Sequence, residues 1–209
     1  MMSSEQGLKL LVLMNMRLPP GVLFTLSQGL RTNQIGCLYL CNVVIPDFFH
    51  NVVIPDMFRL VVPDDESMID NEQNSERRDD ETVYFIEELR QNKSLKELCL
   101  HGSIPSAGIL SNLILALVGH PKLERLVLYR NDEFDQSTRA LCSLLNLGRS
   151  MLSKLTFVGL GSRSSPPRKI NIGPLAEAIV RYGCLQYLDL SNNWLDILDL
   201  ATLLDADSR

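Results

Sequence analysis

Aromatic residues and long apolar runs are both scarce in this chain of 209 residues. Only 6% of the residues are Phe, Trp or Tyr, whereas 45% are hydrophobic, so aliphatic side chains must fill the core. No apolar run approaches the ~20 residues of a membrane-spanning helix, and we expect no membrane segment. The N-terminal stretch GLKLLVLM lacks the preceding basic residues of a secretory signal peptide.

Cysteine is sparse and odd in number. The five Cys form no dense framework, whereas a disulfide-stabilised secreted domain normally has an even number at close spacing. We therefore expect free thiols, a reducing compartment and a cytoplasmic location. Asn92-Lys93-Ser94 fits a glycosylation sequon, which would matter only if the chain were secreted.

A strongly basic region is also missing. The net charge is −5, and residues 64–81 contain nine acids and two Arg, a charge of −7. The rest of the chain therefore carries about +2, because −5 minus −7 is +2. Nucleic-acid-binding domains usually carry a clear basic patch or stripe, so we predict no nucleic-acid partner.

One leucine pattern, by contrast, is abundant. The pattern Leu-x-x-Leu-x-Leu, with Ile or Phe at some positions, occurs six times. Its copies begin at Leu8, Ile35, Leu95, Leu123, Leu152 and Leu185. The steps between starts are 27, 60, 28, 29 and 33 residues, and the step of 60 is about two repeats long. Alternate residues of a strand share one face, so each copy predicts a short strand with a leucine face.

Segments with helical spacing of apolar residues lie between the copies. Such spacing predicts amphipathic helices within residues 22–30, 83–89, 110–117, 141–145 and 175–179. One strand and one helix cannot bury their apolar faces alone, so stacked units must share a core. Because helices are ~10 Å wide and strands lie ~4.8 Å apart, we expect the stack to curve with the strands inside.

Two runs carry a resemblance to a known family. LQYLDLSNNWL, residues 185–195, matches the leucine-rich-repeat phrase L-x-x-L-x-L-x-x-N-x-L at every fixed position, and LERLVLYRN, residues 123–131, matches through its Asn. With a period near 28, the chain resembles the ribonuclease-inhibitor-like subfamily of leucine-rich-repeat proteins. The resemblance implies an α/β solenoid, or horseshoe, of about six repeats, with parallel strands on the concave face and helices on the convex face.

The turn asparagine of this family is not in phase in every repeat. Asn131 and Asn193 occupy its position, whereas Asn15 and Asn42 lie one position early. We therefore expect irregular turns in the other repeats.

The 60-residue step contains an insertion within a single repeat array over residues 1–209. We place the insertion at residues 42–80, in repeat two. In its first part, residues 42–63, the phrase NVVIPDFFH is copied as NVVIPDMFR, which is too short to form a strand, a loop and a helix. The second part, residues 64–81, is acidic with few bulky apolar side chains, which predicts a flexible segment. The next helix is expected to begin near Glu81.

The expected concave face supplies the candidate binding residues. Residues between the leucines of each copy should face this side of the sheet. The candidates for protein binding are Tyr39, Lys96, Glu97, Glu124, Arg125, Lys154, Gln186, Tyr187 and Asp189. Mixed charge with tyrosines suits a protein partner. We therefore predict a non-catalytic protein–protein interaction module that needs no cofactor.

A metal site is the sharpest chemical alternative on this face. Cys37, Cys41, Cys99 and His101 lie on two predicted neighbouring strands, and zinc prefers four such ligands in a tetrahedron. Buried apolar thiols explain the cysteines more simply, so we predict no metal site. The motifs G-x-S-x-G, H-E-x-x-H and G-x-x-x-x-G-K-[ST] do not occur, and no catalytic residue is predicted.

Three other functions stay open. The resemblance allows a GTPase-regulating array, which would need a loop arginine such as Arg130 or Arg163. The chain also fits a ligand-sensing fragment of a larger immune-type receptor, or an inert fragment of an expanded repeat family.

Overall fold

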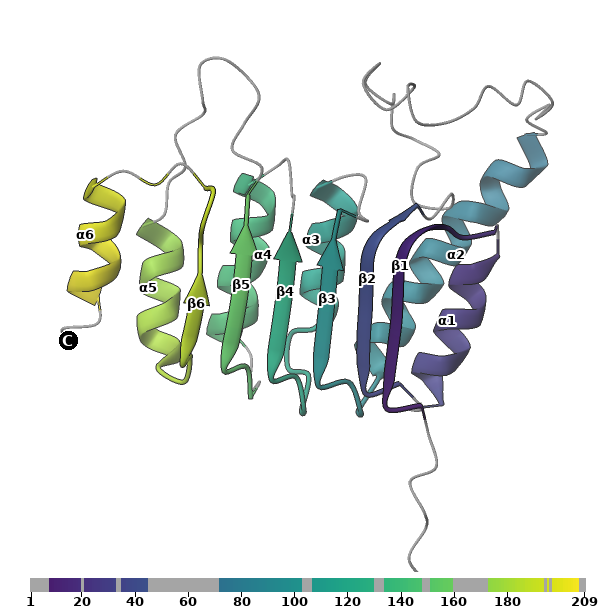
Figure 1. Cartoon of the computed structure of the whole chain (residues 1–209), viewed down its shortest axis with the longest axis horizontal. Helices are drawn as coiled ribbons and strands as arrows, with labels where there is room; N and C mark the ends of the chain where they lie inside the picture. Colours follow the sequence, from purple (N-terminus) through teal and green to yellow (C-terminus); the bar gives the residue numbers. More distant parts are fainter. Residues whose placement is uncertain are drawn as a thin grey trace, which may run out of the picture.

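Within the part of the chain that the structure describes, six strands alternate with six helices (Figure 1). The computed structural model describes residues 8–19, 21–32, 35–44, 72–102, 107–129, 134–147, 151–159, 173–193, 195 and 197–206. The strands are β1 (Leu10–Arg17), β2 (Cys37–Val44), β3 (Glu97–His101), β4 (Arg125–Tyr129), β5 (Lys154–Val158) and β6 (Tyr187–Asp189). The helices are α1 (Val22–Arg31), α2 (Glu72–Gln91), α3 (Ala107–Ala116), α4 (Phe134–Leu147), α5 (Gly173–Tyr182) and α6 (Ile197–Ala206).

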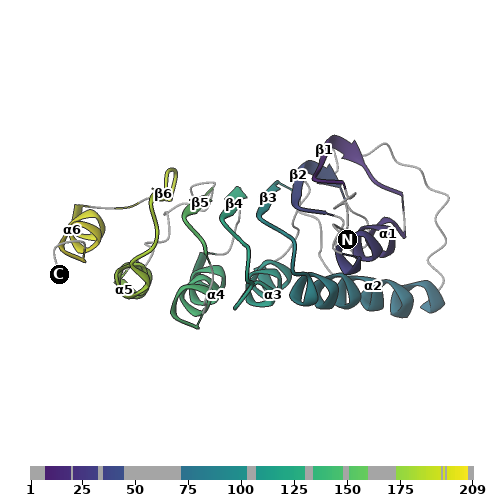
Figure 2. The ribbon, with the colours of Figure 1, turned by 90° about the horizontal axis from the view of Figure 1, so that it is seen from below.

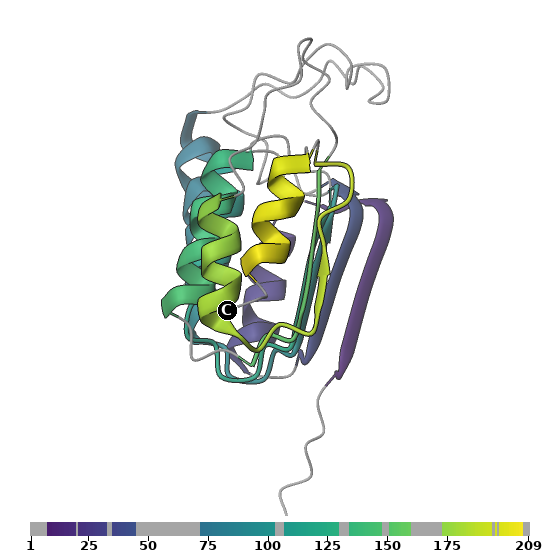
Figure 3. The same cartoon turned by 90° about the vertical axis from the view of Figure 1, so that its left-hand side faces the viewer.

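The strands form one parallel sheet in the order of the chain, from β1 to β6. The helices form a second layer on one face of the sheet, and the opposite face is left without helices (Figures 2 and 3). The predicted α/β alternation with six parallel strands is confirmed. Helix α6 was not expected, although Ile197, Leu200 and Leu204 lie at helical spacing in its sequence.

The core lies between the two layers and consists of leucine rows that run across the sheet. Register places Leu38, Leu98, Leu126, Leu155 and Leu188 side by side. A second row contains Leu40, Leu100, Leu128 and Phe157. Except for Leu188, these side chains are at most 3% exposed. Burying each one stabilises the fold by about 2 kcal/mol, so the repeated pattern produces one continuous core.

A backbone hydrogen-bond ladder fixes the same register between all neighbouring repeats. The residue just before each strand offers its carbonyl to the first N–H of the next strand: Lys9 to Cys37, Lys96 to Arg125, and Ser153 to Tyr187. The same carbonyls of Lys96 and Ser153 also accept from Glu124 and Gln186. We call this the entry ladder, because it lies where each strand begins.

Polar side chains connect successive repeats at two places between the end of a helix and the next strand. Asn92 is 1% exposed, and its Nδ2 donates to the Leu30 carbonyl at 2.6 Å. Its Oδ1 accepts from the N–H groups of Ser94 and Leu95, at 2.9 and 2.7 Å. Tyr182 makes a similar connection, because its hydroxyl donates to the Leu152 carbonyl at 2.8 Å. The sequon at Asn92 is thus a buried structural amide, inaccessible for glycosylation in this fold.

The first two strands are longer than the others because of two asparagines. Asn15 and Asn42 both have a left-handed backbone, with φ of 52°, and Asn42 Nδ2 donates to Asn15 Oδ1 at 3.0 Å. This conformation, which Asn tolerates better than most residues, changes the alternation of the strand. Val43 therefore enters the core, fully buried. The first residues of the duplicated phrase, 42–44, belong to β2, and residues 45–71 lie outside the described residues.

Helix α2 begins at Glu72, so the expected start near Glu81 is wrong. The second half of the acidic segment 64–81 forms the first turns of this helix. Its composition of Glu, Gln and Arg is unfavourable for burial but favourable for a helix, and these are separate properties. Among the described helices, none combines the length and the apolar content needed to cross a membrane.

Candidate protein-interaction face

The face of the sheet opposite the helices, here called the outer face, presents side chains in rows. The first row contains Leu10, Cys37, Glu97, Arg125, Lys154 and Tyr187. The second row contains Val12, Tyr39, Cys99, Val127, Thr156 and Asp189. Parallel in-register pairing brings one residue from each repeat into each row. Neighbouring side chains in a row can therefore form contacts across strands.

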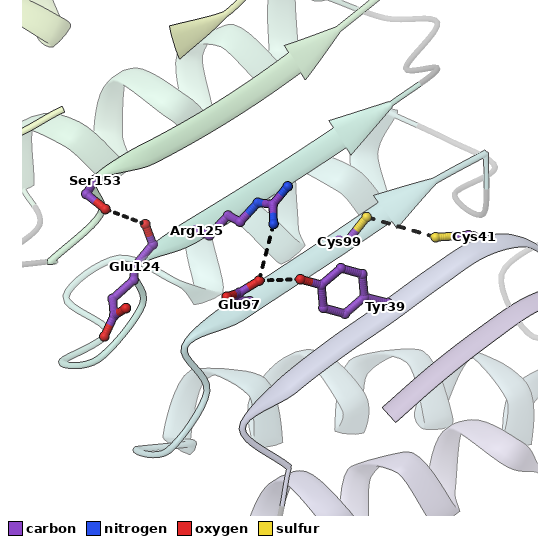
Figure 4. A network of polar contacts seen from close by, with 7 residues as sticks. All are labelled: Tyr39, Cys41, Glu97, Cys99, Glu124, Arg125 and Ser153. Carbon is purple, nitrogen blue, oxygen red and sulfur yellow. Dashed lines mark hydrogen bonds and ion pairs between the residues drawn. The ribbon is translucent and has the colours of Figure 1, made fainter. Parts of the chain in front are cut away.

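Tyr39, Glu97 and Arg125 form a polar cluster across β2, β3 and β4 (Figure 4). The Tyr39 hydroxyl donates to Glu97 Oε2, and Arg125 Nη1 lies 3.6 Å from the same oxygen. All three side chains are partly exposed. The carboxylate thus holds a phenol and a guanidinium in fixed positions at the centre of the outer face.

The environment of this cluster changes the acidity of Tyr39. Partial burial is the main cause, followed by the hydrogen bond to Glu97 and its negative charge, and together they raise the pKa of Tyr39 to about 12. The phenol is therefore a neutral hydrogen-bond donor at physiological pH. Tyrosine and arginine are the residue types most enriched at energetically important positions of protein interfaces.

Two thiols lie beside the cluster. Cys41 Sγ and Cys99 Sγ are 4.0 Å apart on adjacent strands (Figure 4). Burial, followed by the neighbouring Cys41, raises the pKa of Cys99 to about 12, and burial followed by Glu97 raises the pKa of Cys37. The thiols of Cys99 and Cys37 are therefore protonated at neutral pH, and a protonated thiol is a poor nucleophile and metal ligand.

The suggested ligand set of Cys37, Cys41, Cys99 and His101 is not assembled as a metal site. His101 instead packs edge-on against Tyr129, with ring centroids 4.9 Å apart at 81°. Within the described part of the chain, no group of three or more His, Cys, Asp or Glu is placed to hold a metal ion.

The other candidate residues lie at different places on the outer face. Lys154 and Tyr187 are exposed members of the first row. Lys96, Glu124 and Gln186 are exposed but precede their strands by one residue, so they line the edge where the strands begin. The Glu124 carbonyl accepts from Ser153 Oγ at 3.3 Å (Figure 4).

Asp189 serves the turn after β6. One carboxylate oxygen of Asp189 accepts from the N–H of Ser191 at 3.0 Å and from its Oγ at 2.7 Å. This side chain is therefore half-buried and engaged with its own turn, in contrast to the exposed Lys154 and Tyr187.

A third row of side chains on the outer face was not predicted from the sequence. Met14, Cys41, His101, Tyr129 and Val158 align across the first five strands. Strand alternation extends one position beyond the last leucine of each repeat, and this signal identifies the row. Arg130 and Arg163, the arginines considered for GTPase regulation, lie outside the described residues.

No family model matches the chain, and no curated protein matches its sequence. The functional argument therefore depends on the geometry of the outer face.

Proposed function

We propose that the chain is a leucine-rich-repeat solenoid whose outer face binds a protein partner and catalyses no reaction. In-register parallel strands, a helix after each strand and leucine rows between the layers support membership of this structural class. The outer face is then the concave side of the array. A cytoplasmic location is part of the proposal, supported by the odd number of cysteines.

The cluster of Tyr39, Glu97 and Arg125 is the observation that carries the binding proposal. The three side chains come from three adjacent repeats and are connected before any partner arrives. Ordering side chains on binding normally costs free energy, so a preformed cluster lowers the cost of association. A planar guanidinium held beside a phenol suits a carboxylate or a backbone carbonyl of a protein partner.

Affinity capture with matched arginine variants tests the proposal. The immobilised chain should retain a defined set of proteins, and Arg125→Ala and Tyr187→Ala should each reduce recovery of the same set by about tenfold. Arg181→Ala is the matched control, because Arg181 also pairs with a glutamate, Glu177 at 3.4 Å, but on helix α5.

The control variant should capture the partners as the unchanged chain does. Equal recovery with Arg125→Ala, Tyr187→Ala and Arg181→Ala would exclude the outer face as the binding site. Circular dichroism spectra of all variants should coincide, since the substituted side chains lie outside the core.

A further inference from the structure

Two cysteine sulfurs touch on the outer face, beside the Tyr39–Glu97–Arg125 cluster. Cys41 Sγ on β2 and Cys99 Sγ on β3 lie 4.0 Å apart (Figure 4). Both residues are free thiols. The separation is a contact distance, so no other atom lies between the two sulfurs. The fold thus holds a dithiol in place across two strands that are far apart in the sequence.

The structure selects Cys41 over Cys37 as the neighbour of Cys99. Register pairs Cys99 with Tyr39, so Cys37 and Cys41 are both diagonal neighbours of Cys99, one on each side. The Cys99 side chain leans towards Cys41, with which it shares a weak sulfur hydrogen bond. Two cysteines that are equivalent by strand register are therefore not equivalent in the folded chain.

A disulfide between the two sulfurs requires a small approach of the strands. The Cα atoms of a disulfide are usually about 4.4–6.8 Å apart, whereas diagonal neighbours in a sheet are about 7–8 Å apart. The described pairing of β2 with β3 ends at Cys41 and His101. The next residues, Asn42 and Gly102, have left-handed backbones, with φ of 52° and 62°. The regular ladder between these strands stops here, so a shift of about 1 Å brings the two cysteines within disulfide range.

Exposure determines which thiol an oxidant meets first. Cys41 is half-buried, whereas Cys99 is only 8% exposed. The outer face has no helix layer above it, so a small molecule can approach Cys41 from that side (Figures 2 and 3). Cys41 is therefore the thiol that reacts first, and Cys99 is the thiol that reacts second.

Oxidation by a low-molecular-weight disulfide, such as glutathione disulfide, takes two exchange steps. Cys41 Sγ attacks one sulfur of the oxidant and forms a mixed disulfide, while the first glutathione leaves and takes up the Cys41 proton. Cys99 Sγ then attacks Cys41 Sγ, and the second glutathione leaves with the Cys99 proton. Two protein thiols are thereby oxidised to one disulfide, and the oxidant is reduced to two glutathione thiols.

The first step makes the second one easier. Burial, followed by the charge and the hydrogen bond of Cys41, raises the pKa of Cys99 to about 12, and the charge of Arg125 acts in the opposite direction. In the mixed disulfide Cys41 carries neither a charge nor a proton, so its contribution disappears. The Arg125 guanidinium stays in place and stabilises the Cys99 thiolate as it forms.

We propose that Cys41 and Cys99 are a site of reversible oxidation, at which a low-molecular-weight disulfide closes an intrachain disulfide between β2 and β3. The diagonal geometry strains this bond, and strained disulfides are readily reduced again. In a reducing compartment such a disulfide is transient and forms only under oxidising conditions. Its formation does not depend on the proposed partner binding, although it changes the outer face two residues from both Tyr39 and Glu97.

Peptide mapping of the folded chain in glutathione buffers tests the proposal. After oxidation, the remaining free thiols are alkylated in denaturant and the chain is digested with trypsin. Mass spectrometry should find residues 32–59, which contain Cys37 and Cys41, linked to residues 97–122, which contain Cys99. The linked fraction should rise with the proportion of glutathione disulfide and disappear when excess reduced glutathione is restored.

Cys37→Ser is the matched control, because Cys37 lies in the same peptide and is also diagonal to Cys99. It should leave the linked fraction unchanged, whereas Cys41→Ser and Cys99→Ala should each lower it by about tenfold or more. Cys184 is exposed and should carry a mixed disulfide with glutathione, which shows that the oxidant reaches the chain. Circular dichroism checks that the variants fold. Retention in Cys37→Ser with loss in Cys99→Ala identifies Cys41 even without its own variant.

Four results would overturn the proposal. The first is a mixed disulfide at Cys184 without any link between the two peptides, because the oxidant would then have reached the chain without closing the pair. The second is a link that persists in Cys41→Ser, which would assign Cys37 as the partner of Cys99. The third is an equal linked fraction in urea, where the fold cannot direct the reaction. The fourth is a link that survives excess reduced glutathione.

Discussion

Asn193, in the turn after β6, donates from Nδ2 to the carbonyl of Phe157 on β5 at 2.5 Å. The same amide donates to the Leu190 carbonyl at 2.9 Å, and the side chain is 2% exposed. Strand β6 ends at Asp189, whereas β5 continues to Val158, so the asparagine supplies a hydrogen bond where backbone pairing has stopped. The Asn193 side chain thus adds a hydrogen bond between the last described repeat and its neighbour, beyond the end of their backbone pairing.

Replacing this amide should destabilise the protein measurably. Asn193→Ala leaves the Phe157 and Leu190 carbonyls without their donor, and we expect the free energy of unfolding to fall by about 1–3 kcal/mol. Urea unfolding followed by circular dichroism measures the change. Asn146→Ala, an exposed amide on α4, is the control and should change the stability by less than about 0.5 kcal/mol. Equal effects of the two substitutions would contradict the role of Asn193.

Gly159 should tolerate no side chain. A Cβ at this position would overlap Asn193 Oδ1 and would lie 2.9 Å from the backbone carbonyl of Asn192. Gly159→Ala should therefore lower the free energy of unfolding by about 1–3 kcal/mol in the same experiment. Gly108→Ala is the control, because a Cβ there meets nothing within 4 Å and alanine favours the helix that contains it. A stabilising effect at both glycines would show that the close approach at Gly159 is wrong.

His120 should make the stability depend on pH below neutrality. Burial, followed by the charge of Lys93, lowers the pKa of His120 to about 4. Between pH 6.5 and 4 the unfolded chain binds a proton that the folded chain does not, so stability is complete above pH 6.5 and falls as the pH decreases. The full shift corresponds to about 3 kcal/mol, and solvent screening reduces our expectation to about 2 kcal/mol.

The His120→Gln variant isolates this contribution from that of the carboxylates. The difference in free energy of unfolding between the unchanged chain and the variant should change by about 2 kcal/mol between pH 7 and pH 4. A difference that is constant over this range would show that the histidine titrates normally.

Tyr39 should titrate well above the ordinary pKa of a tyrosine side chain. The near-ultraviolet absorbance of tyrosinate, as the difference from Tyr39→Phe, should show a pKa of about 12. Glu97→Gln should move this pKa part of the way back towards 10, because the charge is removed while partial burial remains. The raised pKa contributes stability that is present below pH 10 and is lost as the pH rises towards 12. An unchanged pKa in Glu97→Gln would contradict the contact between the two side chains.

The cost of removing a leucine should depend on its place in the array. Leu128 is fully buried on β4, whereas Leu13 on the edge strand β1 is half-buried. Leu128→Ala should cost about 2–5 kcal/mol and Leu13→Ala about 1–2 kcal/mol, because less apolar contact is lost at the edge. Urea unfolding followed by circular dichroism gives both values. A larger cost for Leu13→Ala would contradict the edge position of β1 in the sheet.

The strands and most helices could be predicted from the sequence because their signals are local and repeated. Each Leu-x-x-Leu-x-Leu segment overlaps a strand, and the five predicted helical segments match α1 to α5, with only Leu117 beyond the end of its helix, α3. The row position of Tyr39, Glu97 and Arg125 follows from alternation alone. The fixed spacing of the leucines therefore determines both the sheet and the side chains that face away from the core.

Other features depend on contacts that spacing does not encode. The hydrogen bond between Tyr39 and Glu97 joins diagonal neighbours and requires particular rotamers of both side chains. An asparagine at position 92 is compatible with a glycosylation sequon, a turn or a buried amide. Only the position of its side chain beside the Leu30 carbonyl distinguishes these roles. Helix α2 starts earlier than expected because helix propensity and hydrophobicity are independent properties. The acidic composition of its first turns shows low hydrophobicity but does not oppose helix formation.

The Asn92 amide and the Tyr182 hydroxyl, which connect two helix ends to the previous repeat, also restrict where the chain can vary in length. Asn92 and Tyr182 act on the short connections that lead from helix to strand, residues 92–96 and 183–186. The two long connections, residues 45–71 and 159–172, both leave the opposite ends of strands, after β2 and β5. Residues can therefore be inserted after the C-terminal ends of the strands, while the short connections at the N-terminal ends fix the register between repeats. A change in loop length then leaves the outer face unaltered.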